Sequence, residues 1–265
     1  MEEVLALWQG PVLASGFLLL LAWESIHPFF RQTGRLVHAV RNLVLAGLNG
    51  VAAVFVFSAL TAAVSGYVAA HGFGLLHRLP LSDYAALALS LVALDAWTYF
   101  WHRVNHRIPL LWRFHRVHHS DENMDVTTAT RFHLGEIVIS SAVRLLIALP
   151  LGLTAAAFLL YDLVLVAVTQ FHHANVGLTA SADRAIRYAI VTPNMHRVHH
   201  SDQRPETDSN FASILSLWDR LFGTYREKHD YRAIRFGLKE LRGEPYQTIR
   251  GMLLTPFINA PTGES

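Results

Sequence analysis

The heptapeptide His-Arg-Val-His-His-Ser-Asp occurs twice in this chain, at residues 115–121 and again at 196–202. Each copy places three histidines at positions i, i+3 and i+4, which fall on one face of a helix within about one turn. Imidazole is the commonest side-chain ligand of first-row transition metals. A further pair, His102 and His106, has i, i+4 spacing just before the first copy. Two such histidine faces predict a metal centre held between helices.

Eight clustered imidazoles exceed what one ion accepts, so the pattern predicts two metal ions. The eight are His102, His106, His115, His118, His119, His196, His199 and His200. A nitrogen-rich set with few carboxylates disfavours magnesium and calcium and suits iron, copper or zinc. The chain has no cysteine, which excludes disulfides, iron–sulfur clusters and thiolate-held metals. Isolated histidines are expected to be ordinary hydrogen-bonded residues; these are His27, His38, His71, His77 and His229.

Several residues near the clusters could support the metal ligands. Asp95 shares a helical face with His102, and a carboxylate buried there is expected to hold a ligand imidazole. His133 and, three residues later, Glu136 could each be a ligand or a residue that orients a ligand, and His133 could also be an ion-pair partner. His172 and His173 are helix neighbours that point about 100° apart, so at most one of them is expected to face the site.

The remainder of the chain reads as a membrane protein. Apolar residues make up 52% of the 265 residues and charged residues 16%, against about 25% charged in soluble domains. Four apolar zones are long enough, or nearly so, to cross a bilayer. They are residues 12–26, 43–70, 84–101 and 137–171. The fourth is too long for one crossing and contains Pro150 and Gly152, so we expect a hairpin there.

The predicted fold is therefore an all-α integral membrane protein with about four transmembrane helices or hairpins and a cytosolic helical cap that carries the histidine motifs. Its expected parts are N-terminal transmembrane helices (1–83), a metal-binding domain (84–225) and a cytosolic or interfacial tail (226–265). Arginines follow the first and third zones, so the positive-inside rule predicts the histidine clusters on the cytoplasmic face and the N-terminus outside. The formal charge of +2 gives no reason to expect a nucleic-acid partner.

The chain resembles the sterol desaturase/fatty acid hydroxylase superfamily of membrane di-iron oxygenases, which includes alkylglycerol monooxygenase. The family pattern is H-x-x-x-H, H-x-x-H-H, F-x-H-x-N and a final H-x-x-H-H, found here at 102–106, 115–119, 171–175 and 196–200. The resemblance covers about residues 84–225. It implies that His173, rather than His172, is the ninth ligand, and it adds Asn175 as a ligand or a supporting residue. Thr169 departs from the pattern, because close fatty acid hydroxylases carry a histidine there.

What the resemblance implies is an O2-dependent non-haem di-iron oxidoreductase that hydroxylates or desaturates a C–H bond of a bilayer lipid. Two iron ions would be the cofactors, O2 the co-substrate, and a separate electron-transfer protein the partner. Zinc could replace iron in purified protein, since iron(II) ranks low in the affinity series. Two alternatives stay open, a di-zinc membrane hydrolase and a metal-binding or transport membrane protein. The first would need a general-base glutamate, which neither heptapeptide contains, and the second would place its ligands at midspan.

Overall fold

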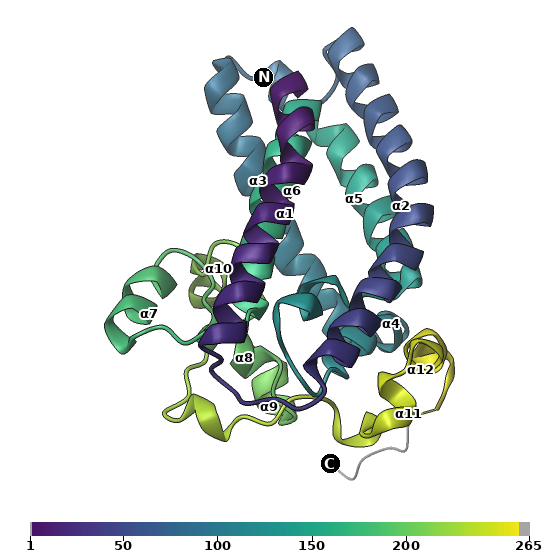
Figure 1. The fold of residues 1–265 in the computed structure, drawn as a ribbon. Helices are drawn as coiled ribbons and strands as arrows, with labels where there is room; N and C mark the ends of the chain where they lie inside the picture. Colours follow the sequence, from purple (N-terminus) through teal and green to yellow (C-terminus); the bar gives the residue numbers. More distant parts are fainter. Residues whose placement is uncertain (1, 260–265) are drawn as a thin grey trace.

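The computed structural model describes residues 2–259, apart from the side chains of residues 51–55. Within this part of the chain the regular structure is helical, with only isolated β-bridges between loops (Figure 1). The predicted all-α class is therefore confirmed for the described residues. Five of the helices are long and apolar enough to cross a membrane. They are α1 (Glu2–Ile26), α2 (Arg35–His71), α3 (Asp83–Arg107), α5 (Leu134–Leu151) and α6 (Ala155–His173).

The fourth apolar zone is a hairpin, as the sequence predicts, and consists of the two helices α5 and α6. Gly152 ends α5 with a φ of 80°, a left-handed conformation that glycine adopts without steric cost. A Cβ on Gly74, in the α2–α3 connection, would lie 2.3 Å from the Gly152 Cα atom. Glycine at both positions thus allows the two connections to touch at the end of the bundle remote from the histidines.

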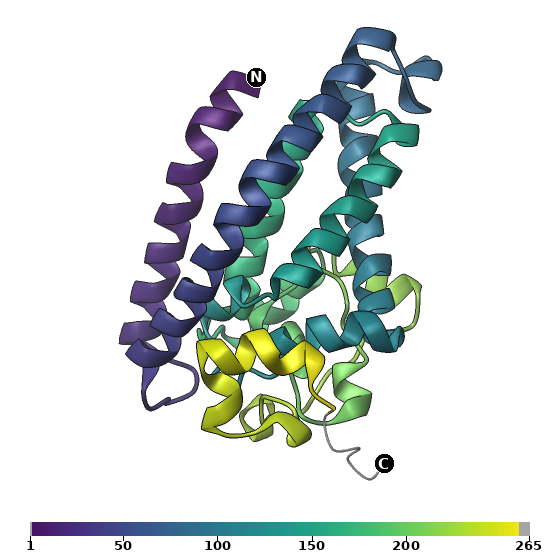
Figure 2. The same cartoon turned by 90° about the vertical axis from the view of Figure 1, so that its right-hand side faces the viewer.

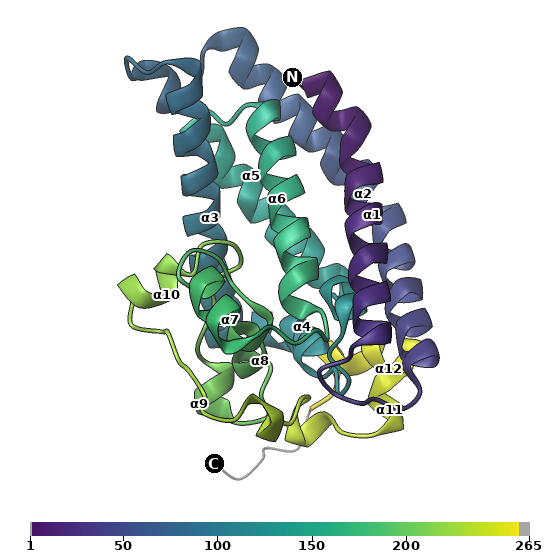
Figure 3. The ribbon, with the colours of Figure 1, turned by 60° about the vertical axis from the view of Figure 1, so that its left-hand side comes forward.

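The long helices lie in two groups in the view of Figure 1, and Figure 3 shows α6 between α3 and α1. α6 packs against α1 and α3, while α5 packs mainly against α2. Between them Arg144 of α5 donates to both carboxylate oxygens of Asp162 of α6, at 2.6 and 3.1 Å. Charges at such depth are costly unless paired, and this pair satisfies both residues.

The remaining helices are short and gather as a cap at one end of the bundle (Figures 1 and 2). They are α4 (Pro109–His119), α7 (Ala180–Arg187), α8 (Pro193–His199), α9 (Arg204–Thr207), α10 (Leu217–Leu221), α11 (Glu244–Gln247) and α12 (Ile249–Leu254). Single 3-10 turns lie at η1 (Leu76–Arg78), η2 (Val126–Thr130), η3 (Tyr231–Ala233), η4 (Lys239–Leu241) and η5 (Thr255–Phe257).

Local sequence signals start the two helices that carry the heptapeptides. Pro109 ends α3 and stands at the first position of α4. The Thr192 hydroxyl accepts from the Met195 N–H, and Pro193 follows at the first position of α8. These signals place each heptapeptide at the end of a short helix in the cap.

Candidate metal centre

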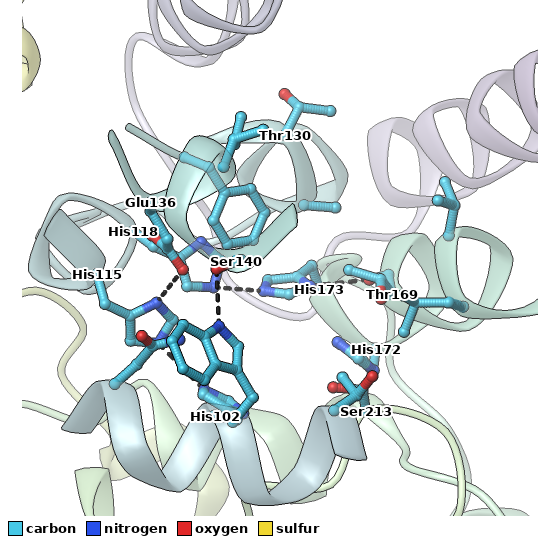
Figure 4. A pocket seen from close by; sticks show the side chains of 18 of the residues that line it. His102, His115, His118, Thr130, Glu136, Ser140, Thr169, His172, His173 and Ser213 are labelled. Carbon is cyan, nitrogen blue, oxygen red and sulfur yellow. Dashed lines mark hydrogen bonds and ion pairs between the residues drawn. The ribbon is translucent and has the colours of Figure 1, made fainter. Parts of the chain in front are cut away.

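Four elements deliver nine histidines to one place, where the long helices meet the cap. The last turns of α3 carry His102 and His106, and the end of α6 carries His173. The two heptapeptides arrive on α4 and α8. Figure 4 shows part of this convergence around His102, His115, His118 and His173. The structure thus brings together all nine histidines that the sequence and the resemblance single out.

The nine histidines divide into two groups, and within each group the ligand atoms lie within 4.8 Å of one another. Group A consists of His102, His106, His115, His119 and His199. Group B consists of His118, His173, His196 and His200. Two groups of this size fit the predicted two ions.

Each heptapeptide contributes to both groups because of helical geometry. Positions i and i+4 lie about 40° apart around a helix, whereas i+3 lies on the other side of position i. In the first copy the i and i+4 histidines join group A and the i+3 histidine joins group B. In the second copy the assignment is reversed: i and i+4 join group B, and i+3 joins group A. The helices α4 and α8 therefore each contribute histidines to both group A and group B.

Hydrogen bonds fix the proton on the outward nitrogen of several rings. The Nδ1 atoms of His102, His173 and His199 donate to the backbone carbonyls of Phe211, Thr169 and Ser209, at 2.7 to 2.8 Å. Because a carbonyl only accepts, each Nδ1 carries the hydrogen and each Nε2 presents a lone pair to the centre.

Two rings of the cap, those of His199 and His200, are also kept neutral. Burial, reinforced by the neighbouring imidazoles, lowers the pKa of His199 and of His200 well below the ordinary value. A neutral imidazole is the form that binds a metal. The electrostatics of the centre therefore favour the ligand form of its histidines.

Lone pairs that face one another test whether metal ions fit. His102 Nδ1 donates to Phe211 and His115 Nδ1 donates to Glu136, so in neutral rings, the form that binds a metal, both Nε2 atoms lack a proton and face each other at 3.1 Å. The buried Nε2 atoms of His106 and His199 have no hydrogen-bond partner among the described residues. A cation between these nitrogens would turn repulsion and unmet polarity into coordination. The residues present fit two metal ions.

A cavity of about 360 Å³ opens beside the centre between α3, α5 and α6 (Figure 4). Histidines of both groups form one end of it, among them His102 and His173. The opposite wall comes from the long helices, where Val166 and Leu165 are apolar and Ser140 accepts from the Trp101 indole N–H at 2.7 Å. The cavity thus connects the histidines to the membrane-length part of the molecule.

The role expected for Asp95 is wrong. Its carboxylate accepts from the Leu215 N–H at 3.1 Å and the Trp218 indole N–H at 2.7 Å, and from no imidazole. Seven residues of helix separate Asp95 from His102 by about 10 Å along the axis, too far for a hydrogen bond. Asp95 instead anchors the loop that also carries Phe211, whose carbonyl holds His102.

His172 also differs from the prediction. It does not point away from the site: its ring centroid lies 4.0 Å from that of His196, and it lines the cavity. The end of α6 is enclosed by α8 and the cavity, so two neighbouring positions both face the centre. His173 belongs to group B and His172 to neither group, which keeps the predicted order of the two.

The sequence left open the roles of Glu136, His133 and Asn175. Glu136 contacts a histidine of group A, whereas His133 and Asn175 do not contact either group. The Glu136 Oε1 atom accepts from His115 Nδ1 at 2.7 Å. His133 begins α5, where its Nδ1 accepts from the Gly135 N–H, and its Nε2 donates to the Leu253 carbonyl. Asn175 forms two side-chain hydrogen bonds with the Phe30 backbone. Among the described residues His133 and Asn175 therefore support neighbouring chain segments and belong to neither group.

Two carboxylates beside the centre were missed by sequence reasoning. Asp121 ends the first heptapeptide, is fully buried, and accepts from His38 Nε2 at 2.8 Å. Its presence in a repeat was the available signal. Asp208 accepts from His106 Nδ1 at 3.3 Å, and nothing in its loop sequence distinguishes it. His38 lies outside both groups, as expected, and its other nitrogen donates to Asp125.

Two groups of histidines that could hold metal ions lie beside a cavity among helices long and apolar enough to cross a membrane. The chain belongs to the fatty acid hydroxylase family, whose model matches residues 87–224. This match contains all nine histidines.

Three similar proteins are named as hydroxylases or as a monooxygenase. The chain is 31% identical over 139 residues to ornithine lipid hydroxylase OlsE of Rhizobium tropici, which covers 52% of this chain and 41% of that protein. It is 29% identical over 143 residues to human alkylglycerol monooxygenase (53% and 31%) and 24% identical over 140 residues to rat cholesterol 25-hydroxylase (52% and 46%). The matched region spans less than half of each of these relatives. No solved structure matches.

Proposed function

We propose that this protein is a membrane-bound, O2-dependent di-iron hydroxylase of a lipid. The observation that carries the proposal is the pair of histidine groups at one end of a cavity lined in large part by the membrane-length helices α3, α5 and α6. The relatives support hydroxylation in particular, since they are named as hydroxylases or monooxygenases of lipids. The balanced reaction converts R–H, O2, two electrons and two protons to R–OH and water.

The nine histidines would hold two iron ions, which when bound supply the reduction of O2 and the oxidation of an unactivated C–H bond. Group A offers five nitrogens and group B four, so group B has the more open surroundings for a reactant. Three group B histidines, His118, His173 and His196, line the cavity directly. The protein's part is to fix these ligands, exclude water around buried rings and bring one lipid carbon to that end of the cavity.

The two sides of the molecule suit a lipid substrate from the bilayer and a separate electron carrier from the cytoplasm. Arg103, Arg107 and Arg113 follow the apolar part of α3, and on the positive-inside rule they favour a cytoplasmic cap. A reporter fused after Arg107 is expected to lie in the cytoplasm and one fused after Ala70 outside. Opposite results would remove the basis for the proposed orientation.

The test of the function is oxygen transfer in purified protein. The chain would be reconstituted with iron in lipid nanodiscs, given dithionite or a reduced carrier, and supplied with isotopically labelled oxygen gas. We expect labelled oxygen in one lipid of a cell extract offered as substrate, no product under anaerobic conditions, and none with His118→Ala. Turnover that persists without oxygen, with zinc as the bound metal, would support the hydrolase alternative and overturn the proposal.

A further inference from the structure

The metal centre comes close to the surface at a second place, away from the cavity. His106 of group A is fully buried, but its Nδ1 donates to Asp208, whose side chain is 38% exposed. The Trp112 ring covers the same side, with its centroid 4.9 Å from that of His106. Arg204 lies 5.0 Å above Trp112 and donates to Asp208 at 2.7 Å. One layer of side chains thus separates group A from the surface of the cap.

Arginines surround this place, and most of them lack an acidic partner. We name Arg103, Arg107, Arg204 and Arg226 the arginine rim. Arg107 is exposed and its side chain makes no hydrogen bond or ion pair with any described residue. Arg103 donates to the Tyr99 hydroxyl and lies over the Tyr99 ring, and it forms no ion pair with any described residue.

Backbone hydrogen bonds place the other members of the rim at the same surface. Arg204 donates to the His106 carbonyl, at the last turn of α3. Arg226 exchanges hydrogen bonds with the Asn210 side chain, two residues after Asp208, and is exposed. Asp208 is balanced by Arg204, and nearby Glu206 is balanced by Lys228. The rim therefore keeps an excess of positive charge.

We propose that the arginine rim is the docking surface of a soluble, acidic protein that carries one electron at a time. This rests on the proposed function, in which each turnover consumes two electrons from an external donor. An acidic partner is the one that the uncompensated arginines attract and steer. Docking there would set the donor over Trp112 and His106, while the cavity on the other side of the centre stays free for lipid.

The test compares charge reversal at the rim with the same change elsewhere on the cap. The variants are Arg103→Glu with Arg107→Glu, Arg107→Glu alone, and the control Arg250→Glu on α12, an exposed residue whose helix packs against α2. The protein is held in nanodiscs of zwitterionic lipid, so anionic lipid cannot bind the rim. The probe is an acidic [2Fe–2S] ferredoxin, and its dissociation constant is measured by calorimetry with unchanged thermal unfolding as the check on folding.

Wild-type protein should bind the ferredoxin, and more weakly as salt is raised, since exposed charges are screened over about 8 Å at physiological ionic strength. We expect the double variant to weaken binding by about tenfold or more, in line with measured electrostatic steering effects. Arg107→Glu alone should lie between, and Arg250→Glu should change binding less than twofold. If the double variant fails to fold, the single variant carries the comparison.

Equal binding of the rim variants and the control, or no binding by wild-type protein, would overturn the docking surface. The same variants separate this result from the proposed function, because dithionite needs no docking. Reduction by dithionite and the product formed with it should match wild type within twofold in every variant. If dithionite yields no oxygenated product while rim-dependent binding stands, the proposed function fails and the docking surface remains.

Discussion

The two copies of the heptapeptide have the same seven residues and very different surroundings. Their histidines are equally buried and serve the same two groups in reversed roles. Val117 of the first copy packs with Leu45 and Met252, whereas Val198 of the second packs with Met124 and Phe236. The repeat thus fixes the geometry of the histidines, while the equivalent valines of the two copies pack against different parts of the fold.

The arginines of the two copies show the same division. Arg116 donates to the carbonyls of Thr255 and Ile258, near the end of the described chain. Arg197 is buried, donates to the carbonyls of Ala174 and Val176, and lies 4.2 Å above the Phe29 ring. One copy therefore fastens the C-terminal segment and the other fastens the ends of α1 and α6. Identical residues stabilise different parts of the fold.

The largest expected difference between the copies comes from their i+4 histidines. His119→Ala would leave group A with four nitrogens, and His200→Ala would leave group B with three. Since stable sites usually have four ligands, we expect His200→Ala to retain about one ion per chain and to lose turnover, and His119→Ala to retain closer to two. Metal analysis after dialysis against a weak chelator measures this. Equal metal loss in both variants would contradict the assignment of groups.

Next in size is the aspartate that ends each copy. Burial raises the pKa of Asp121, but His38 and Arg131 outweigh it and hold that pKa well below its usual range, so the carboxylate is charged. Asp121→Asn breaks a buried ion pair and should lower the free energy of unfolding by about 3 kcal/mol or more. Asp202 pairs with the half-exposed Arg242, so Asp202→Asn should cost about 1 kcal/mol at most.

Thermal and denaturant unfolding in the same detergent would measure both changes. Arg242→Gln serves as the control for the second pair, since it removes the partner of Asp202 without touching the histidines. Similar losses of stability for Asp121→Asn and Asp202→Asn would mean that the two copies are not anchored differently.

How much of the site could be predicted from the sequence depends on how far apart along the chain two contacting residues lie. Eight of the nine histidines could be predicted, because spacing within one turn decides which face they share, and the family resemblance added His173. The contrast between Asp121 and Asp202 could not, because the heptapeptides are identical and the partner of Asp121 is His38, on a helix 83 residues earlier. The error at Asp95 has the same origin: its partner Trp218 approaches from α10, 123 residues later.

The fold shows the same limit. The hairpin at Gly152 and the starts of α4 and α8 follow from proline, glycine and threonine at their ends, which act locally. The gathering of the short cap helices under the bundle has no local signal, since it depends on contacts between remote segments such as α12 with α2.

A smaller effect is expected at the first histidine of each heptapeptide, on the ring nitrogen Nδ1 that points away from the other ligands. His115 Nδ1 donates to Glu136, whereas Nδ1 of His196 has no partner among the described residues. Glu136→Gln keeps the shape but weakens the acceptor, and loss of such support costs about 10–100-fold in metal affinity or activity. We expect the lower end of that range for metal affinity, with unchanged thermal unfolding. Competition with a coloured chelator measures it, and unchanged affinity would show that Glu136 only fills space.

The smallest expected effect is at His172. Its ring lies against that of His196, in the way that Glu136 lies against His115 in the first copy. His172 lines the cavity but belongs to neither group, so His172→Gln should retain both ions and change KM for the lipid more than kcat. A change of about 1 kcal/mol in the free energy of lipid binding corresponds to about fivefold in KM. The matched control is His173→Gln, which removes a group B nitrogen and should lose metal and turnover together. Loss of metal in the His172 variant with retention in the His173 variant would show that His172, and not His173, belongs to group B.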